Sequence, residues 1–257
     1  MSDAAAPAAP LPLGDRPSDT SSAARRKVFI ELTLLWLVTN LLIRAVIAAQ
    51  TGLGLPDWTL AAVPCLFIYA PVALCRWRGV DSYDYRLYVP AFRDVGAWGQ
   101  ALGQAAALMG VILVPWLIGY HLYQTQLFGH SPQWDRLPDE LFTLVLYQVF
   151  FVAIPEEFFY RGYMQTRLNE VFHRPYLLGG AAFGAAFGAA LWVTALYFAF
   201  GHSLVVLRWW HPAIFFPGLL FGLLRERTGG VLAPAFFHAA CNLLVVILDT
   251  QYGLIAP

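Results

Sequence analysis

Two adjacent acidic residues and a nearby arginine interrupt a long apolar segment in the sequence PEEFFYRGYMQ, residues 155–165. A charged side chain at the centre of a membrane helix costs about 2.5 kcal/mol or more, so such residues usually serve a function. In a helix, Glu157 and Arg161 lie four residues apart on one face and can pair. Glu156 is rotated by about 100° from Glu157 and therefore meets a different environment. The spacing predicts one carboxylate held by a base and a second one free to react.

Three further polar side chains interrupt apolar sequence towards the C-terminus. His202 ends the sequence FAFGH, and His238 and Asn242 begin and end the sequence HAACN. Their four-residue spacing places His238 and Asn242 on the same face of a helix. A lone histidine within a membrane often does no more than bond a backbone carbonyl. Two acids, two imidazoles, an amide and a guanidinium on three predicted helices instead favour a functional site.

These side chains are of the types that hydrolysis requires. A carboxylate in an apolar cavity can act as a base that activates water, with an imidazole holding the same water. A second imidazole and an amide are suitable donors to an oxyanion. The sequence contains no G-x-S-x-G or H-E-x-x-H motif, and no serine or cysteine has an evident base partner, so covalent catalysis is not supported. A Glu-His-His set could also ligate zinc, because three protein ligands and a water form the usual catalytic zinc site.

The composition places these residues in a membrane protein. Of the 257 residues, 59% are hydrophobic and only 12% are charged, whereas a soluble domain carries about 25% charged residues. Several apolar segments approach or exceed the roughly 18 residues of a membrane-spanning helix. The net charge of zero gives no reason to expect a nucleic-acid partner. We therefore predict an all-α, polytopic helical bundle whose partner is the lipid bilayer of a cell membrane.

The apolar segments predict seven transmembrane helices, or eight if residues 202–210 form a short helix of their own. The expected spans are 28–49, 58–75, 98–120, 141–163, a run between 177 and 200, 212–224 and 231–248. Residues 1–24 are rich in Ala, Pro and Ser without periodicity and are expected to form a disordered N-terminal tail. Residues 25–140 then supply the N-terminal transmembrane helices, and residues 141–250 the catalytic helical core.

Basic residues indicate the orientation of the bundle. With the N-terminus inside, the segments between spans place only Arg136 and Arg208 on the outer side. The predicted cytoplasmic residues are Arg25, Arg26, Lys27, Arg76, Arg78, Arg86, Arg93, Arg161, Arg167, Arg174, Arg225 and Arg227. This asymmetry predicts a cytoplasmic N-terminus. The chain has a single lysine beside fifteen arginines, a bias typical of GC-rich bacterial genomes, so we expect a bacterial inner membrane.

Three motifs in this order resemble the CPBP intramembrane proteases, a family that includes CAAX prenyl endopeptidases and bacteriocin-processing proteins. The motifs are E-E-x-x-x-R at 156–161, F-x-x-x-H at 198–202 and H-x-x-x-N at 238–242. The sequence TGGVLAPAFFHAACN, residues 228–242, is also similar to the family's usual T-G-S-x-x-A-P-x-x-x-H-A-x-x-N. The resemblance covers roughly residues 141–248.

The resemblance implies an intramembrane endopeptidase that cleaves a peptide bond near the membrane-anchored, C-terminal end of a protein substrate. Glu156 and His202 would activate water. His238 and Asn242 would stabilise the oxyanion. Some bacterial relatives, the myxosortases, process C-terminal sorting signals of surface proteins, which makes such a signal one expected substrate.

The resemblance also implies a supporting pair and leaves one cofactor question open. Arg161 would pair with Glu157 and hold the acidic segment in place. No cofactor is required in this interpretation. Zinc is the alternative, because the family has also been described with metal ligands; here these would be Glu156, His202 and His238.

Two other classes of function stay open at this point. Buried Glu and His residues also suit a proton-coupled transporter or proton relay. The sequence shows no inverted repeat of broken helices, and the His-x-x-x-Asn motif has no evident task in a relay. A catalytically silent membrane scaffold would keep the fold, but the complete set of motifs argues against it.

One spacing imposes a structural requirement. Glu156 and His202 are 46 residues apart, which is longer than the family leads us to expect. A straight helix from residue 177 would carry His202 about 37 Å, right across the bilayer, whereas His238 follows Val231 by only seven residues. The motifs can meet only if residues 174–190 contain a loop, a kink or an extension outside the membrane. The small residues of 179–190 otherwise predict close helix–helix packing.

The remaining features have structural interpretations. Pro155 cannot donate to the preceding turn, which predicts a kink that helps to open a wet cavity beside Glu156. His121, His130, His173 and His211 are interpreted as interfacial residues.

Overall fold

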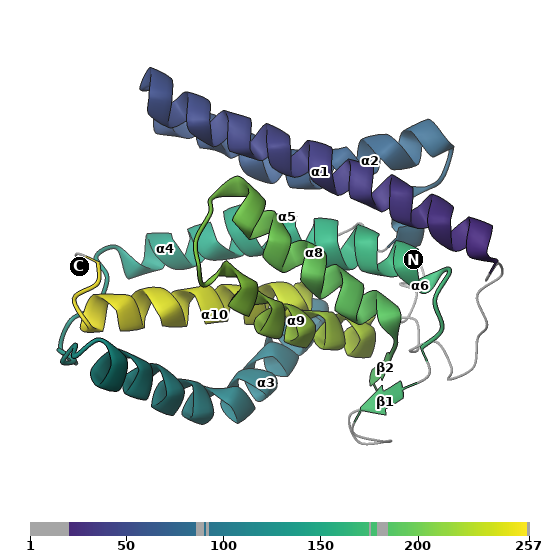
Figure 1. Cartoon of the computed structure of the whole chain (residues 1–257). Coiled ribbons are helices and arrows are strands. Elements are labelled where there is room, and N and C mark those ends of the chain that lie inside the picture. The colour runs from purple at the N-terminus through teal and green to yellow at the C-terminus, as the bar shows by residue number, and fades with distance from the viewer. Residues whose placement is uncertain (1–20, 86–89, 91–92, 175, 179–184, 256–257) are drawn as a thin grey trace.

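Helices dominate the computed structural model, which describes residues 21–85, 90, 93–174, 176–178 and 185–255 (Figure 1). Within these residues, five helices are long and apolar enough to cross a membrane. They are Ser22–Leu53, Asp57–Arg78, Val95–Leu127, Leu141–Asn169 and Leu232–Gln251. The fold is therefore the all-α, polytopic membrane bundle that the composition predicts.

The N-terminal half contributes three of these helices. They are α1, Ser22–Leu53, α2, Ala62–Arg78, and α3, Val95–Leu122. The Ser21 side chain caps α1 by accepting a hydrogen bond from the backbone N–H of Ala24 at 3.1 Å. Gly54 and Gly79 adopt left-handed conformations and end α1 and α2. The expected disordered tail lies outside the described residues except for its end, where residues 22–24 are helical instead.

The EExxxR motif lies in a single long helix, Leu141–Asn169, in which α-helical and π-helical segments alternate. Its α-helical parts are α4, Leu141–Tyr147, α5, Ile154–Glu157, and α6, Thr166–Asn169, and π-helical segments Gln148–Ala153 and Phe158–Gln165 join them. Pro155 is buried in the first turn of α5, directly after the first π-helical segment. The missing N–H of a proline is tolerated where local π adjustments rearrange the neighbouring bonds. The chain thus passes Pro155 without leaving the helix.

Three further helices complete the core: α8, Ala189–Val205, α9, Phe215–Thr228, and α10, Leu232–Gln251. Each of the seven predicted spans therefore has a helical counterpart, although α8 and α9 have only 17 and 14 residues. The eighth helix considered for residues 202–210 is not seen as a separate element. Residues 206–210 are not helical, and a 3-10 helix at His211–Ile214 leads into α9.

A short hairpin supplies the bend required between the first two motifs. Strands β1, Tyr176–Leu178, and β2, Ala185–Phe187, pair antiparallel with Leu177 opposite Ala186. Because α8 begins only at Ala189, His202 lies about 20 Å along that helix instead of 37 Å. The predicted interruption in 174–190 is confirmed. The prediction of close helix–helix packing by the small residues of 179–190 is wrong for residues 185–187, which form a strand. Residues 179–184 lie outside the described residues.

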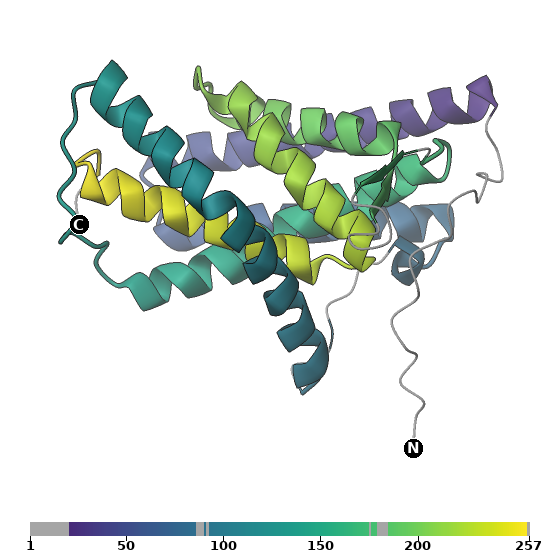
Figure 2. The same cartoon turned by 90° about the horizontal axis from the view of Figure 1, so that it is seen from below.

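The helices form layers around α10. In Figure 1, α1 and α2 lie above the Leu141–Asn169 helix, and α3 lies below α10. Figure 2, turned by 90°, shows α3 and α9 on the near side of the bundle. α10 packs against α3, α9 and the Leu141–Asn169 helix, whereas α1 packs against α2 and α8. The outer faces of α1 and α3 expose large apolar side chains such as Leu34, Leu42, Val111 and Ile118, as expected for surfaces that face lipid.

A partly buried acid joins the N-terminal helices to the core. Glu31 on α1 accepts hydrogen bonds through Oε1 from Tyr163 at 2.8 Å and from Arg167 at 3.1 Å. The same oxygen also accepts one from Arg78 on α2 at 3.4 Å. One carboxylate oxygen therefore links α1, α2 and the Leu141–Asn169 helix. Glu31 belongs to none of the three motifs.

Gly201 allows a close approach between α8 and its neighbours, directly before His202. A Cβ atom at this position would lie 2.4 Å from the Tyr160 hydroxyl and 3.1 Å from Oδ1 of Asn40. We expect Gly201→Ala to lower the free energy of unfolding by about 1–3 kcal/mol, because a methyl group forced into a packed site shifts its neighbours. Denaturation in detergent measures this. Gly103→Ala, an exposed glycine in α3 with open space around its Cβ, is the control and should be neutral or stabilising; equal stability of both variants would contradict the prediction.

Candidate active site

The predicted pair between Glu157 and Arg161 is present and fully buried. Arg161 Nη1 donates to Glu157 Oε1 at 2.9 Å, and both side chains have 0% exposure. Arg161 Nη2 also donates to the carbonyl oxygen of Gly218 on α9 at 3.0 Å. Its guanidinium lies 4.3 Å from the ring centroid of Phe198 and 5.1 Å from that of Phe221. Arg161 therefore binds the acidic segment to both α8 and α9.

Glu157 has a second partner that the sequence analysis missed. His238 Nδ1 donates to Glu157 Oε1 at 3.0 Å, so α10 is tied to the same carboxylate. The His238 side chain is 4% exposed, and its ring stacks on Phe221 with 4.6 Å between the centroids. The orientation of His238 is thus set on two sides, by a carboxylate and by an aromatic face.

Glu156 faces the two histidines without touching them. Its Oε2 lies 3.9 Å from Nε2 of His202 and 3.9 Å from Nε2 of His238. These distances exceed the 2.7–3.2 Å or so of a hydrogen bond. This buried oxygen has no hydrogen-bond partner in the described part of the chain. A buried acceptor left unpaired costs about 1–3 kcal/mol, and a gap of this length between polar groups suits a bridging water.

The F-x-x-x-H motif determines how His202 presents its ring. His202 Nδ1 lies 2.9 Å from the carbonyl oxygen of Phe198, one turn earlier on α8. A carbonyl oxygen can only accept, so Nδ1 carries the proton in this contact. In neutral His202 the other nitrogen, Nε2, is therefore an acceptor, and it is the atom that faces Glu156.

Asn242 contacts a residue outside all three motifs. Its Nδ2 donates to Oε1 of Gln148 at 3.0 Å, across the interface between α10 and the Leu141–Asn169 helix. The sequence signal for Gln148 was weak, because it consists of one amide eight residues before Glu156 in an apolar run. Spacing alone does not connect residues 148 and 242.

His211, interpreted from the sequence as an interfacial residue, is buried within the protein. It is 6% exposed, and its ring centroid lies 5.9 Å from that of His202. Burial lowers the pKa of His211 below its ordinary value. The 3-10 helix that precedes α9 therefore places a third imidazole beside the site, on the His202 side.

The candidate metal ligands match zinc in donor type but not in arrangement. Glu156, His202 and His238 carry suitable oxygen and nitrogen donors. The Nδ1 atoms of both histidines are held by acceptors, as they are in metal-bound histidines. Among the described residues, however, no group of three or more His, Cys, Asp or Glu side chains has a geometry that could hold a metal ion.

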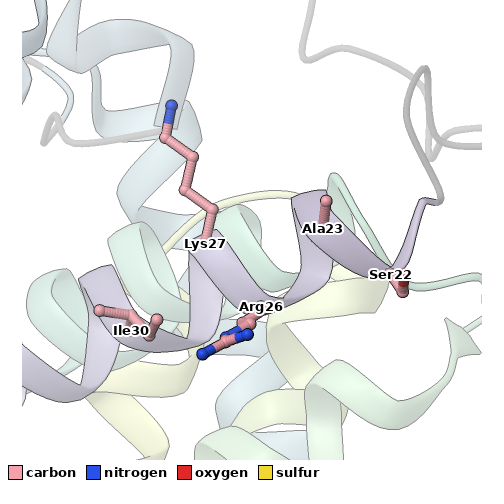
Figure 3. A pocket seen from close by; sticks show the side chains of 5 residues that line it. All are labelled: Ser22, Ala23, Arg26, Lys27 and Ile30. Carbon is pink, nitrogen blue, oxygen red and sulfur yellow. The ribbon is translucent and has the colours of Figure 1, made fainter.

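A surface hollow lies elsewhere, at the N-terminal end of α1. It is lined by Ser22, Ala23, Arg26, Lys27 and Ile30. Figure 3 shows Lys27 and Arg26 pointing to different sides of the helix, so their charges do not converge on one point. This hollow contains no motif residue and does not belong to the candidate site.

A comparison with known families matches the part of the chain that contains the three motifs. Residues 138–244 match the family model described as Rce1-like, type II CAAX prenyl endopeptidase Rce1-like, and this range contains all three motifs. Neither a curated protein nor a solved structure matches the chain. The match confirms the resemblance stated on the three motifs. Through residues 138–244, this multi-pass membrane protein therefore matches the Rce1-like, CAAX-type endopeptidases, and the match supports the CPBP intramembrane protease family.

Proposed function

We propose that this protein hydrolyses a peptide bond near the membrane-anchored, C-terminal end of a protein substrate, with Glu156 as the base. The observation that carries the proposal is the position of Glu156 Oε2, which is buried, has no hydrogen-bond partner among the described residues, and lies 3.9 Å from two imidazole nitrogens. The neighbouring carboxylate is already engaged by Arg161 and His238. The two acids therefore have different roles.

Water activation follows from the tautomer of His202. With Nδ1–H directed to the Phe198 carbonyl, Nε2 of His202 is an acceptor. A water between Nε2 and Glu156 Oε2 donates one proton to each of them. Its remaining lone pairs then face away from both acceptors, towards the carbonyl carbon of a bound peptide. Glu156 takes the proton as the water attacks.

Oxyanion stabilisation follows from the different partner of His238. Its Nδ1 donates to the carboxylate of Glu157, so a proton at Nε2 produces an imidazolium whose other N–H faces a negative charge. In that form Nε2–H donates to the oxyanion. Asn242, one turn further along α10, supplies the second donor. The two histidines thus act differently because of what each Nδ1 contacts.

Completion of the reaction returns the proton. The tetrahedral intermediate collapses, the bond between the carbonyl carbon and the nitrogen breaks, and Glu156 transfers its proton to the leaving amine. The products are a carboxylate and a free amine, and Glu156 is again ionised. Arg161 does not take part in these steps; it holds Glu157, and through it His238, in position.

A metal-dependent variant of this site uses the same residues. Glu156, His202 and His238 would hold the ion, which would supply Lewis-acid polarisation of a carbonyl and a more acidic water. Among the described residues, these side chains do not have a metal-binding arrangement.

The cellular setting is part of the proposal. Residues 25–140 serve as a membrane scaffold and residues 141–250 as the catalytic core, with the N-terminus in the cytoplasm and the bundle in a bacterial inner membrane. The asymmetry of basic residues and the preference for arginine over lysine support this setting. The substrate class comprises proteins with a lipid-anchored or membrane-spanning C-terminal end, such as those with C-terminal sorting signals.

The test is cleavage by purified protein in liposomes. Two probes are used, a peptide with a prenylated cysteine three residues before its C-terminus, and a peptide ending in a transmembrane segment. We expect cleavage of at least one probe, and we expect the rate to survive exhaustive chelation with less than about a twofold change, because no step is routed through a metal. Mass spectrometry of the products and metal analysis of the protein provide the measurement.

Three outcomes would change the proposal. Loss of cleavage on chelation and recovery with zinc would establish the metal-dependent variant. Proton flux across the liposome membrane that depends on Glu156, without cleavage, would favour a proton relay. Neither cleavage nor flux with any probe would indicate a silent scaffold.

A further inference from the structure

We propose that Gln148 is a positioning residue that orients the side-chain amide of Asn242. The inference rests on the proposed function, in which Asn242 donates to the oxyanion. Gln148 Oε1 accepts a hydrogen bond from Asn242 Nδ2 at 3.0 Å, and both residues are partly buried. Gln148 lies outside the three motifs and has no other role in the proposed mechanism.

Two polar contacts set the register between α10 and the Leu141–Asn169 helix. On α10, His238 contacts Glu157, and Asn242, four residues later, contacts Gln148. On the Leu141–Asn169 helix, Gln148 lies nine residues before Glu157. The two helices therefore run in opposite directions where they meet, as Figure 1 shows. Each of the two proposed oxyanion donors on α10 is held by one side chain of the facing helix.

The π-helical segment explains how Gln148 comes to face the site. In a regular α-helix, eight residues correspond to a rotation that leaves Gln148 and Glu156 about 80° apart. A π-bulge absorbs about one extra residue, which reduces the difference to about 20°. The segment Gln148–Ala153 is π-helical and begins at Gln148 itself. The irregular backbone thus places Gln148 and Glu156 on nearly the same face.

The chemistry of the amide explains why this contact matters. A half-turn of the terminal torsion exchanges the oxygen and the nitrogen of Asn242, and an oxygen facing the oxyanion would repel it. Gln148 Oε1 accepts from Nδ2 and so selects one of the two orientations. The second N–H of Asn242 makes no hydrogen bond within the part of the chain that the structure describes, so it is available to the oxyanion. Preorganised donors of this kind lower the barrier without reorganisation during the reaction.

Steady-state cleavage of the liposome probes tests this role. Gln148→Met keeps the length of the side chain but cannot accept a hydrogen bond from Asn242. We expect this variant to lower kcat about tenfold with KM unchanged, because the Asn242 amide then takes the wrong orientation in most, but not all, molecules. Gln148→Glu keeps an acceptor at the same reach, so we expect its kcat within about threefold of the wild type. Gln126→Met, at an exposed glutamine outside the site, is the matched control and should leave both constants unchanged.

A double-mutant cycle separates positioning from an independent effect. Asn242→Ala is expected to lower kcat about a hundredfold, and adding Gln148→Met should lower it no further, because Gln148 acts only through Asn242. Losses that multiply in the double variant, or a wild-type kcat for Gln148→Met, would overturn the positioning role. Should Gln148→Met fail to fold, Gln148→Asn decides the question, because its oxygen is one carbon too short to reach; a wild-type kcat for that variant also overturns the role. A wild-type kcat for Asn242→Ala would instead refute the oxyanion assignment of the proposed function.

Discussion

Replacement of Glu156 by glutamine is expected to reduce kcat for probe cleavage by about a thousandfold, with little change in KM. The amide has the same size as the carboxylate but cannot take a proton from water, and general base catalysis contributes about 10²–10⁴-fold. Substrate contacts are expected to persist because the shape of the site is kept. The measurement is the rate of product formation by purified variants in liposomes at saturating probe.

Two comparisons make this result specific. Glu140→Gln introduces the same change at an exposed residue directly before α4 and should leave kcat unaltered. Glu157→Gln weakens the contacts to Arg161 and His238, so its loss of activity should be accompanied by a lower melting temperature, unlike that of Glu156→Gln. Undiminished cleavage by Glu156→Gln at normal stability would exclude Glu156 as the base.

Replacement of Arg161 by methionine is expected to have the largest effect on stability. Arg161 is completely buried, and its loss leaves the Glu157 carboxylate without its ion-pair partner and removes the hydrogen bond to the Gly218 carbonyl. Removal of one partner of a buried ion pair costs about 3–5 kcal/mol, because the other charge stays buried. We expect a loss of this size in the free energy of unfolding, measured by chemical denaturation in detergent micelles.

The design of this experiment separates the pair from the arginine itself. Arg136→Met, at an exposed arginine between α3 and α4, should change the free energy of unfolding by less than about 0.5 kcal/mol. The double variant Glu157→Gln, Arg161→Met removes both charges and should recover part of the lost stability, because no unpaired charge is left. If Arg161→Met unfolds at the same denaturant concentration as the wild type, the buried pair does not stabilise this fold.

Much of the architecture follows from local patterns in the sequence. Long apolar runs predict helices at all seven expected positions, because a helix satisfies its own backbone hydrogen bonds within one segment. The pairing of Glu157 with Arg161 follows from their four-residue spacing, because residues at i and i+4 lie on the same face of a helix. The interruption within 174–190 also followed from length alone, since an unbroken helix would have carried His202 too far.

Contacts between helices were decided only by the tertiary structure. The bonds from His238 to Glu157 and from Asn242 to Gln148 join residues 81 and 94 positions apart, and the burial of His211 against His202 depends on a short turn between α8 and α9. Helical periodicity reports which residues share a face, but it contains no information about which faces meet or at what register. The π-helical segments in Leu141–Asn169 rotate those faces further. The sequence by itself therefore determined the membrane helices and the residue types of the site, whereas the packing of the helices decided which carboxylate faces the two histidines and which one holds His238.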